Sequence, residues 1–286
     1  MMVTKLPNRA RSRARKFLIG ALVLALTLGV ILVTTKALDR SLETTRSQLR
    51  SPKIATSVTF VVLADLHSCD YGEGQKELVD AVDTVHPDAV LMAGDVADDR
   101  LPFKKAQELC EVLASKYPCY YVTGNHEWWS KKAPEYKAQF AALGVTVLSG
   151  ETVELTLNGQ QIQLAGIDDP AGGRFEEQLA AVARQRDSAK FSILLSHRPE
   201  RIARYEKAGF DLVVAGHAHG GQWRLPGFNR GLIAPNQGLL PKYVNGLYRA
   251  GDTTLLVTRG LARESTRIPR LYNRPELVVL SVAPGE

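Results

Sequence analysis

Aspartate, asparagine and histidine side chains occur in five short loops, each directly after a run of residues that favours a β-strand. Imidazole nitrogens and carboxylate or amide oxygens are the ligands that many divalent metals prefer in proteins. Taken singly, each loop also fits an ordinary polar turn. The loops read Asp65-Leu66-His67, Gly94-Asp95, Gly124-Asn125-His126-Glu127, Ser196-His197 and Gly216-His217-Ala218-His219-Gly220-Gly221.

Spacing within the first two loops suits metal binding. Asp65 and His67 stand two residues apart, so an extended backbone places both side chains on the same side, as two ligands of one metal require. Glycine at position 94 permits a tight turn immediately before Asp95. The sequence therefore predicts that both carboxylates reach a common crevice.

The other loops add an amide and further imidazoles. Neighbours in an extended loop point to opposite sides, so Asn125 can face a metal while His126 faces another group. His217 and His219 lie two residues apart between glycines, and this is the most specific of the five patterns. His86 precedes a proline at a predicted helix end, and we interpret it as a solvated residue.

Alternating strands and amphipathic helices must position these loops. Apolar, β-branched runs predict buried strands, and apolar side chains at helical spacing predict the helices between them. In open α/β sheets ligands gather at the carboxyl ends of the strands, so we expect the five loops to converge. The predicted strands are 58–64, 88–93, 119–122, 145–148, 151–157, 161–165, 191–195 and 212–215, and the predicted helices are 73–85, 103–116, 134–143, 175–186 and 199–208.

The last part of the chain is strand-rich. After residue 220 the helical period disappears, and 244–248, 253–258 and 277–282 read as strands. Asn158-Gly159, between two alternating runs, predicts a type I′ hairpin. We predict one α/β domain over 57–286, with a mixed sheet or two packed sheets and helices outside.

An uncharged apolar run over residues 17–35 predicts a membrane anchor. At 1.5 Å per residue it covers nearly the ~30 Å hydrocarbon core, and no polar stripe interrupts it. A cleaved signal peptide is the alternative, but the run is long and no small-x-small site follows. We predict a basic arm over 1–16, the anchor over 17–35 and a polar juxtamembrane linker over 36–56.

Charge is concentrated at the N-terminus. Lys and Arg total 36 against 30 Asp and Glu, and removing the six cations before residue 17 leaves the rest balanced. The pI of about 9.2 therefore reflects the arm, and no nucleic-acid partner is expected. Dense positive charge before the span predicts a cytoplasmic N-terminus and a body outside the cytoplasm. The cysteines, Cys69, Cys110 and Cys119, fit neither a disulfide framework nor a zinc spacing.

The motifs D-x-H, G-D, G-N-H-E, a lone H and G-H-x-H, in this order and each after a strand, resemble those of the calcineurin-like metallophosphoesterase family. The resemblance covers roughly residues 58–222, and no element is missing. The ending Gly216 to Gln222, together with the anchor, is similar to a membrane-associated bacterial phosphodiesterase branch. The resemblance implies a sandwich of two packed mixed β-sheets flanked by helices, preceded by one transmembrane helix.

The resemblance also implies two divalent metal ions, and the donor set fits Mn²⁺, Fe or Zn²⁺ without choosing among them. Its implied reaction is hydrolysis of phosphate esters, expected to be diesters, by attack of a metal-activated hydroxide. Two carboxylates against four metal charges leave about two positive charges for hydroxide and phosphate. The implied ligands are Asp65, His67 and His219 for one ion, Asn125, His197 and His217 for the other, and Asp95 for both.

His126 is the candidate general acid because it can face the leaving group while Asn125 faces metal. The resemblance suggests that Asp98 orients His126 by hydrogen bonding its far nitrogen, and Asp99 can compete for that role.

Two alternatives remain open. A pyrophosphatase acting on a nucleotide-linked lipid precursor is motivated by the anchor, which would hold the site near head groups. A non-catalytic metal-binding module of the same fold would show eroded ligands as its usual signature, and none of the seven positions is eroded.

Overall fold

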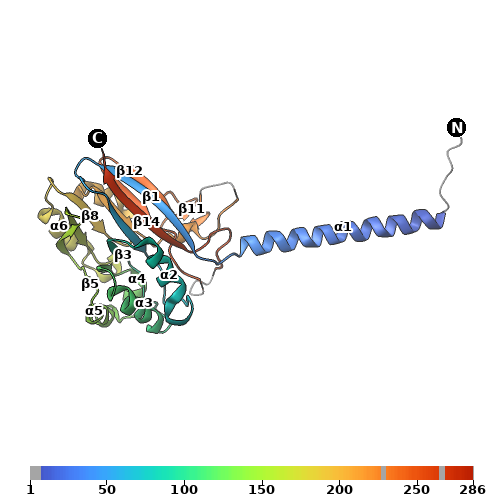
Figure 1. Ribbon diagram of the computed structural model, residues 1–286, viewed down its shortest axis with the longest axis horizontal. Helices are drawn as coiled ribbons and strands as arrows, with labels where there is room; N and C mark the ends of the chain where they lie inside the picture. Colours follow the sequence, from blue (N-terminus) through green and yellow to red (C-terminus); the bar gives the residue numbers. More distant parts are fainter. Residues whose placement is uncertain (1–7, 227–229, 264–267, 286) are drawn as a thin grey trace.

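The computed structural model describes residues 8–226, 230–263 and 268–285, and only the backbone of residues 8–11 and 14. Helix α1 (Asn8–Ala37) projects from a body in which two six-stranded sheets pack together (Figure 1). Residues 1–7 of the predicted basic arm lie outside the described residues.

The first sheet carries three of the predicted loops. Strands β2 to β5 run parallel, and β14 is antiparallel to β2. Helices α2 (Lys76–Val85), α3 (Lys104–Ala114) and α5 (Ala133–Ala142) cover its outer face, where their apolar side chains form one core with the sheet. The strand order is β1 (Glu43–Ser51), β14 (Glu276–Pro284), β2 (Val58–Leu63), β3 (Ala89–Ala93), β4 (Cys119–Val122) and β5 (Thr146–Val147).

The second sheet carries the remaining two loops. Its outer face is covered by α6 (Phe175–Gln185) and α7 (Ile202–Ala208), whose apolar side chains pack against the sheet. Asn158 and Gly159 both adopt positive φ between its first two strands, as the predicted type I′ turn requires. The strand order is β12 (Gly246–Ala250), β13 (Thr253–Val257), β9 (Leu212–Ala215), β8 (Phe191–Leu195), β7 (Gln160–Gly166) and β6 (Glu151–Leu157).

A separate apolar core lies between the sheets. Phe60 and Val62 from the first sheet meet Ile193 and Val214 from the second, and all four are fully buried. Strands buried on both faces must be apolar on both, which is why they read as continuous hydrophobic runs. This layering confirms the predicted fold of two packed mixed sheets flanked by helices.

Short elements connect the layers. Strands β10 (Ile233–Ala234) and β11 (Gly238–Leu239) form a two-stranded hairpin that the sequence did not predict. One short helix, α4 (Asn125–Trp129), begins at the loop after β4. Single 3-10 turns occur at η1 (Glu73–Gln75), η2 (Pro170–Gly172), η3 (Pro199–Arg201) and η4 (His219–Gly221).

Part of the predicted linker belongs to the first sheet. Residues Glu43–Ser51 form β1, which pairs in parallel with β14 along its whole length. β1 is an edge strand, and its residues alternate between half-buried and exposed because successive side chains point to opposite faces of the sheet, one of which faces solvent here. A polar sequence therefore forms a strand here, and the assignment of all of 36–56 to a linker needs this correction.

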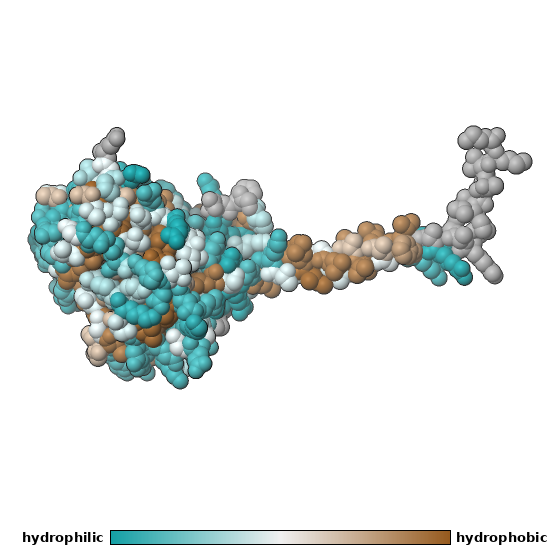
Figure 2. Space-filling view, in the orientation of Figure 1, coloured by the Kyte–Doolittle hydropathy of each residue, from teal (hydrophilic) through white to brown (hydrophobic). Residues whose placement is uncertain are grey.

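Helix α1 contains the predicted anchor. Its most apolar 18-residue window within Arg15–Ala37 has a mean hydropathy of 2.7, and none of that window is buried against the body. Figure 2 shows these apolar side chains standing clear of the folded domain. The helix is long and apolar enough to cross a membrane.

We expect a chain starting at residue 40 to fold more stably than one starting at residue 57. The shorter chain loses β1, including Leu49, which packs on the inter-sheet core, and the ion pair between Glu43 and Arg259 at 2.8 Å. A loss of about 2 kcal/mol corresponds to a fall in melting temperature of roughly 4–8 °C for a domain of this size. Calorimetry on the two chains measures the difference, and equal melting temperatures would contradict a structural role for β1.

Candidate metal centre

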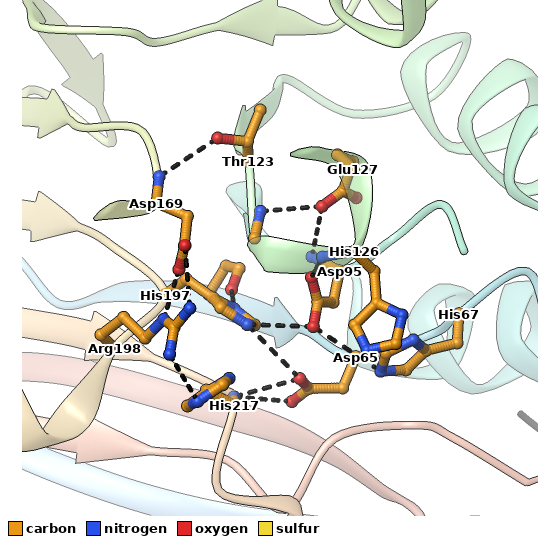
Figure 3. Close-up of polar contacts among 12 residues, drawn as sticks. Asp65, His67, Asp95, Thr123, His126, Glu127, Asp169, His197, Arg198 and His217 are labelled. Carbon is orange, nitrogen blue, oxygen red and sulfur yellow. Dashed lines mark hydrogen bonds and ion pairs between the residues drawn. The ribbon is translucent and has the colours of Figure 1, made fainter. Parts of the chain in front are cut away.

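The five predicted loops meet at the carboxyl ends of β2, β3, β4, β8 and β9 (Figure 3). Six of the seven predicted ligands fall into two groups whose ligand atoms lie within 4.8 Å of one another in each group. A third such group contains His67 with Asp98 and His126. The first two groups are Asp65 with His67 and His219, and Asp95 with His197 and His217.

Asp95 belongs to the second group and also faces the first. Its Oδ2 atom is 3.1 Å from His197 Nε2 and 3.7 Å from His67 Nε2. Its Oδ1 atom accepts a hydrogen bond from the backbone N–H of His126 at 2.8 Å. Because one oxygen is fixed by the backbone, the other is free to face both groups at once.

Two imidazoles are oriented by partners on their far side. His67 Nδ1 lies 3.0 Å from an oxygen of Asp98, and His197 Nδ1 lies 2.7 Å from the carbonyl oxygen of Ala93. An acceptor at Nδ1 holds the proton there and leaves the lone pair on Nε2. Both Nε2 atoms point into the site, in the form that binds a metal.

Several buried polar atoms at this point have no hydrogen-bond partner among the described residues. Such atoms are rare in folded proteins because each costs about 1–3 kcal/mol. A divalent cation would satisfy all of them, since each is a nitrogen or oxygen ligand atom. The residues present thus fit a metal centre. The atoms are His67 Nε2, Asp95 Oδ2, Asn125 Oδ1 and His197 Nε2.

Asn125 is the seventh predicted ligand. It is buried and opens α4, so its side chain projects from a helical turn and not from the extended loop that the sequence predicts. Successive side chains on a helix diverge by about 100°, so Asn125 and His126 still point in different directions.

Unusual backbone geometry holds the predicted ligands. Five of the seven have positive φ, a region that side chains other than glycine rarely adopt and that recurs at functional sites. The extended conformation predicted for the first loop is therefore wrong, because its two ligands converge through left-handed turns. The five are Asp65, His67, Asp95, His217 and His219.

Two glycines leave room for the carboxylates of Asp95 and Asp65. A Cβ atom at Gly124 would lie 2.2 Å from Asp95 Oδ1, and one at Gly216 would lie 2.7 Å from Asp65 Oδ2. Any side chain at either position would push a carboxylate out of the site.

The electrostatics of the site balance carboxylates against imidazoles. Burial raises the pKa of Asp65. Burial acts in the same direction on Asp95, but the charge of His197 and of other imidazoles lowers its pKa well below the usual range. Burial disfavours charged His197, yet Asp95 and Asp65 raise its pKa to about 10. The carboxylates thus attract positive charge, which a metal ion can supply in place of the proton.

The other two imidazoles are neutral. Burial lowers the pKa of His217 well below its usual value, and nearby His197 and Arg198 lower it further. Burial, His67 and Arg270 have the same effect on His219. Neutral imidazole is the form that coordinates metals.

Glu127 is a positioning residue that the sequence did not single out. Its carboxylate accepts hydrogen bonds from the backbone N–H groups of Asp95, Ala97 and Gly124 at 3.1, 3.0 and 2.8 Å. Burial and the charge of Asp95 raise its pKa to about 8. One side chain thereby ties two ligand loops together.

A second network supports His217. Arg198 forms a bidentate ion pair with Asp169, and its Nη1 atom lies 3.0 Å from His217 Nε2. Asn236 Oδ1 lies 2.8 Å from the same imidazole nitrogen. No motif marks Arg198 or Asn236, because their relation to His217 arises only when distant loops meet.

Arg270 is a further cation that sequence reasoning missed. Its side chain is 6% exposed, and Nη2 lies 3.5 Å from His219 Nδ1. Its Nε and Nη1 atoms have no hydrogen-bond partner among the described residues. A buried guanidinium with free donors is suited to binding an anion.

His126 lies at the edge of the site. Its Nδ1 atom is 2.7 Å from Asp99 Oδ1 and 3.2 Å from Asp98 Oδ1, so the two carboxylates share the orienting role and Asp99 is closer. Burial lowers the pKa of His126, but the hydrogen bond to Asp98 and the nearby carboxylate charges raise it to about 9. The ring is also in edge contact with His67, with centroids 4.3 Å apart.

Comparison with known proteins agrees with the geometry. Residues 58–221 match the family described as calcineurin-like phosphoesterase. The uncharacterized metallophosphoesterase YkuE of Bacillus subtilis is 30% identical, over 84% of this chain and 85% of its own. Phosphodiesterase YaeI of Escherichia coli is 28% identical, over 68% and 70% of the two chains.

One mammalian relative is named as a transmembrane protein. The transmembrane protein with metallophosphoesterase domain of Bos taurus is 29% identical over 82% of this chain, which spans 55% of the bovine protein. The family match extends over more than half of this sequence and includes all five loops. The chain therefore belongs to the calcineurin-like phosphoesterase family.

Proposed function

We propose that the protein is a membrane-anchored phosphodiesterase with two metal ions at this site. The observation that carries the proposal is the position of Asp95 Oδ2, which faces His197 and His67 from between the two groups. One carboxylate oxygen shared by two imidazole groups is the arrangement that a bridged metal pair needs. The proposed ligands are Asp65, His67, Asp95, Asn125, His197, His217 and His219.

When bound, two divalent ions supply Lewis acidity and lower the pKa of water to near neutrality. The ligands hold a charge of minus two from Asp65 and Asp95, so the loaded site stays positive and attracts a phosphate ester. Arg270 adds one more positive charge beside the first group, and its free donors are available to a phosphate oxygen.

His126 is the proposed proton donor to the leaving oxygen. Its Nδ1 atom is held by Asp99 and Asp98, so the remaining Nε2 atom is the one that can deliver a proton. Proton donation matters most for alkoxide leaving groups, which depart from diesters with difficulty. The name of the related YaeI protein, a phosphodiesterase, supports a diester as substrate.

Helix α1 is the proposed anchor, with the body outside the cytoplasm. Its length and hydropathy support a membrane span, and a related protein is named as transmembrane. The dense positive charge before residue 17 supports a cytoplasmic N-terminus.

Removing the proposed bridge should reduce metal content. We expect Asp95→Asn to retain at most one ion per chain and to lose phosphodiesterase activity, because a neutral amide cannot hold two cations together. Elemental analysis and a bis(p-nitrophenyl) phosphate assay measure both effects. Asp252→Asn, at an exposed position, is the control. Two ions and normal turnover in the Asp95 variant would exclude the bridging role.

The acid role of His126 predicts loss of turnover without loss of metal. We expect His126→Asn to lower kcat by about 10²–10⁴-fold, since an amide cannot donate a proton in the same way. His86→Asn, at an exposed histidine, should behave as the unmodified protein. Wild-type turnover in the His126 variant would remove this residue from the mechanism.

The orientation predicts the behaviour of a C-terminal reporter. A reporter that is active only in the cytoplasm should be inactive when fused after the last residue, because the body lies across the membrane. A matching fusion directly before α1 should be active. Full activity of the C-terminal fusion would reverse the proposed topology.

A further inference from the structure

An apolar cavity of about 460 Å³ lies against the metal centre. His219, a proposed ligand, forms part of its wall, together with Asn236, the hydrogen-bond partner of His217. Most of the remaining lining is uncharged and apolar, and includes Ile233, Ala234 and Ile268. The cavity therefore contacts one proposed ligand, His219 of the first group, and is connected to the second group only through Asn236, the partner of His217.

Exposed apolar side chains gather in the segments that form this cavity. A soluble surface rarely exposes large apolar residues so densely, and such patches mark interaction sites. Leu239 and Leu240, at the end of the β10–β11 hairpin, are 79% and 70% exposed. We call this set the apolar patch: Trp223, Leu225, Ile233, Leu239, Leu240 and Ile268.

Backbone contacts connect the apolar patch to the end of helix α1. The carbonyl of Ala37 accepts a hydrogen bond from Tyr272, and neighbouring Leu271 forms a β-bridge with Trp223. The backbone N–H of Leu232 donates a hydrogen bond to the carbonyl of Trp223, and the backbone N–H of Leu240 donates one to the carbonyl of Leu232. Four steps of about 5 Å place the hairpin on the order of 20 Å from the helix end.

The picture of the whole molecule agrees with these contacts. Figure 1 shows β11 on the side of the body from which α1 projects. If α1 spans a bilayer, this side of the body is the one that faces the lipid surface.

Charge in the same segment suits a lipid surface. From Trp223 to Ala250 the sequence contains no acidic residue, and three of its four cations, Arg230, Lys242 and Arg249, are exposed, whereas Arg224 is buried. Apolar side chains that enter a bilayer beside cations that contact anionic head groups are the usual composition of an interfacial surface.

A second cavity differs in chemistry. It has a volume of about 320 Å³, and its lining includes Asp98, Asp99, Ser130 and Lys132. Among the residues that the structure describes, it shares no lining residue with the apolar cavity. Since Asp98 and Asp99 hold His126, this polar cavity adjoins the proposed proton donor.

We propose that the apolar cavity binds the hydrocarbon chain of a membrane lipid whose phosphodiester is hydrolysed at the adjacent centre, an inference that rests on the proposed function. The chain enters from the bilayer across the apolar patch and ends beside His219. The polar alcohol of the diester lies on the His126 side and is the group that leaves. Water oxygen bonds to phosphorus as one of its protons passes to solvent, the bond from phosphorus to the polar alcohol breaks, and that oxygen takes a proton from His126, which solvent then reprotonates. The products are a lipid phosphomonoester and a free alcohol.

The test uses the full chain in lipid nanodiscs, loaded with Mn²⁺, and p-nitrophenyl esters of methyl, butyl and octyl phosphate. In each substrate p-nitrophenol is the leaving group and the alkyl chain remains on phosphorus. Each buried methylene contributes about a fourfold gain in binding. We expect kcat/KM for the octyl ester to exceed that for the methyl ester by at least tenfold.

Variants assign this preference to the cavity. Ile233→Glu places a charge in the lining and should bring the octyl-to-methyl ratio close to one. Leu247→Glu is the matched control, because Leu247 has the same 39% exposure on a strand and does not line the cavity. Ile268→Glu, in a different segment, serves as a second lining variant if the first fails to fold.

Each outcome has a separate meaning. A wild-type ratio near one, with clear hydrolysis of the methyl ester, overturns the lipid proposal and leaves the phosphodiesterase intact. Absence of hydrolysis of every ester by the metal-loaded protein overturns the proposed function itself. A lining variant that changes the oligomeric state and keeps the octyl preference assigns the cavity to a second copy of the chain and also overturns the proposal.

Discussion

The structure depends on one constraint: two buried carboxylates and four imidazoles are directed at a common point, where they do not meet all of one another's hydrogen-bonding needs. Within the described part of the chain, Asp95 Oδ2 and the Nε2 atoms of His67 and His197 lack hydrogen-bond partners, although all three are buried. Such an arrangement is unfavourable for the protein alone, because buried polar atoms need partners. Divalent cations would remove this penalty, since they neutralise the negative charge of the carboxylates and accept the free lone pairs of the imidazoles. The site is thus a preorganised candidate ligand set, and a bound metal would stabilise it.

The surrounding fold makes this arrangement possible. Parallel strands with apolar side chains on both faces fix the positions of the loops, and the core between the sheets fixes the two halves of the site relative to each other. Left-handed backbone at five proposed ligand positions is a strained feature that the rigid sheets over-determine, and glycine at positions 124 and 216 leaves room for the two carboxylates. Glu127 then joins two loops through three backbone hydrogen bonds. The backbone turns, the two glycines and Glu127 together hold the carboxylates and imidazoles of the site close to one another.

The environment of the centre is asymmetric. One side adjoins an apolar cavity and exposed leucines near the end of α1, and the other adjoins a polar cavity beside Asp98 and Asp99. An amphiphilic phosphodiester has the same asymmetry, with its phosphate between an apolar and a polar part. In the proposed function, helix α1 and the apolar patch act together, because α1 would hold the body at the bilayer and the patch would admit a lipid chain from it.

The sequence alone determined the buried strands, the order of the loops that carry the proposed ligands, and the apolar helix, because each depends on local composition: a strand covered on both faces must be apolar, and a helix able to cross a bilayer must be long and uncharged. Convergence of the loops followed from the rule that parallel strands end at one edge. Tertiary structure alone decided that polar residues 43–51 form an edge strand, that Asp99 lies closer than Asp98 to His126, and that Arg198, Asn236 and Arg270 border the ligands. These features depend on contacts between residues far apart in the chain, and neither hydrophobic period nor motif spacing records such contacts.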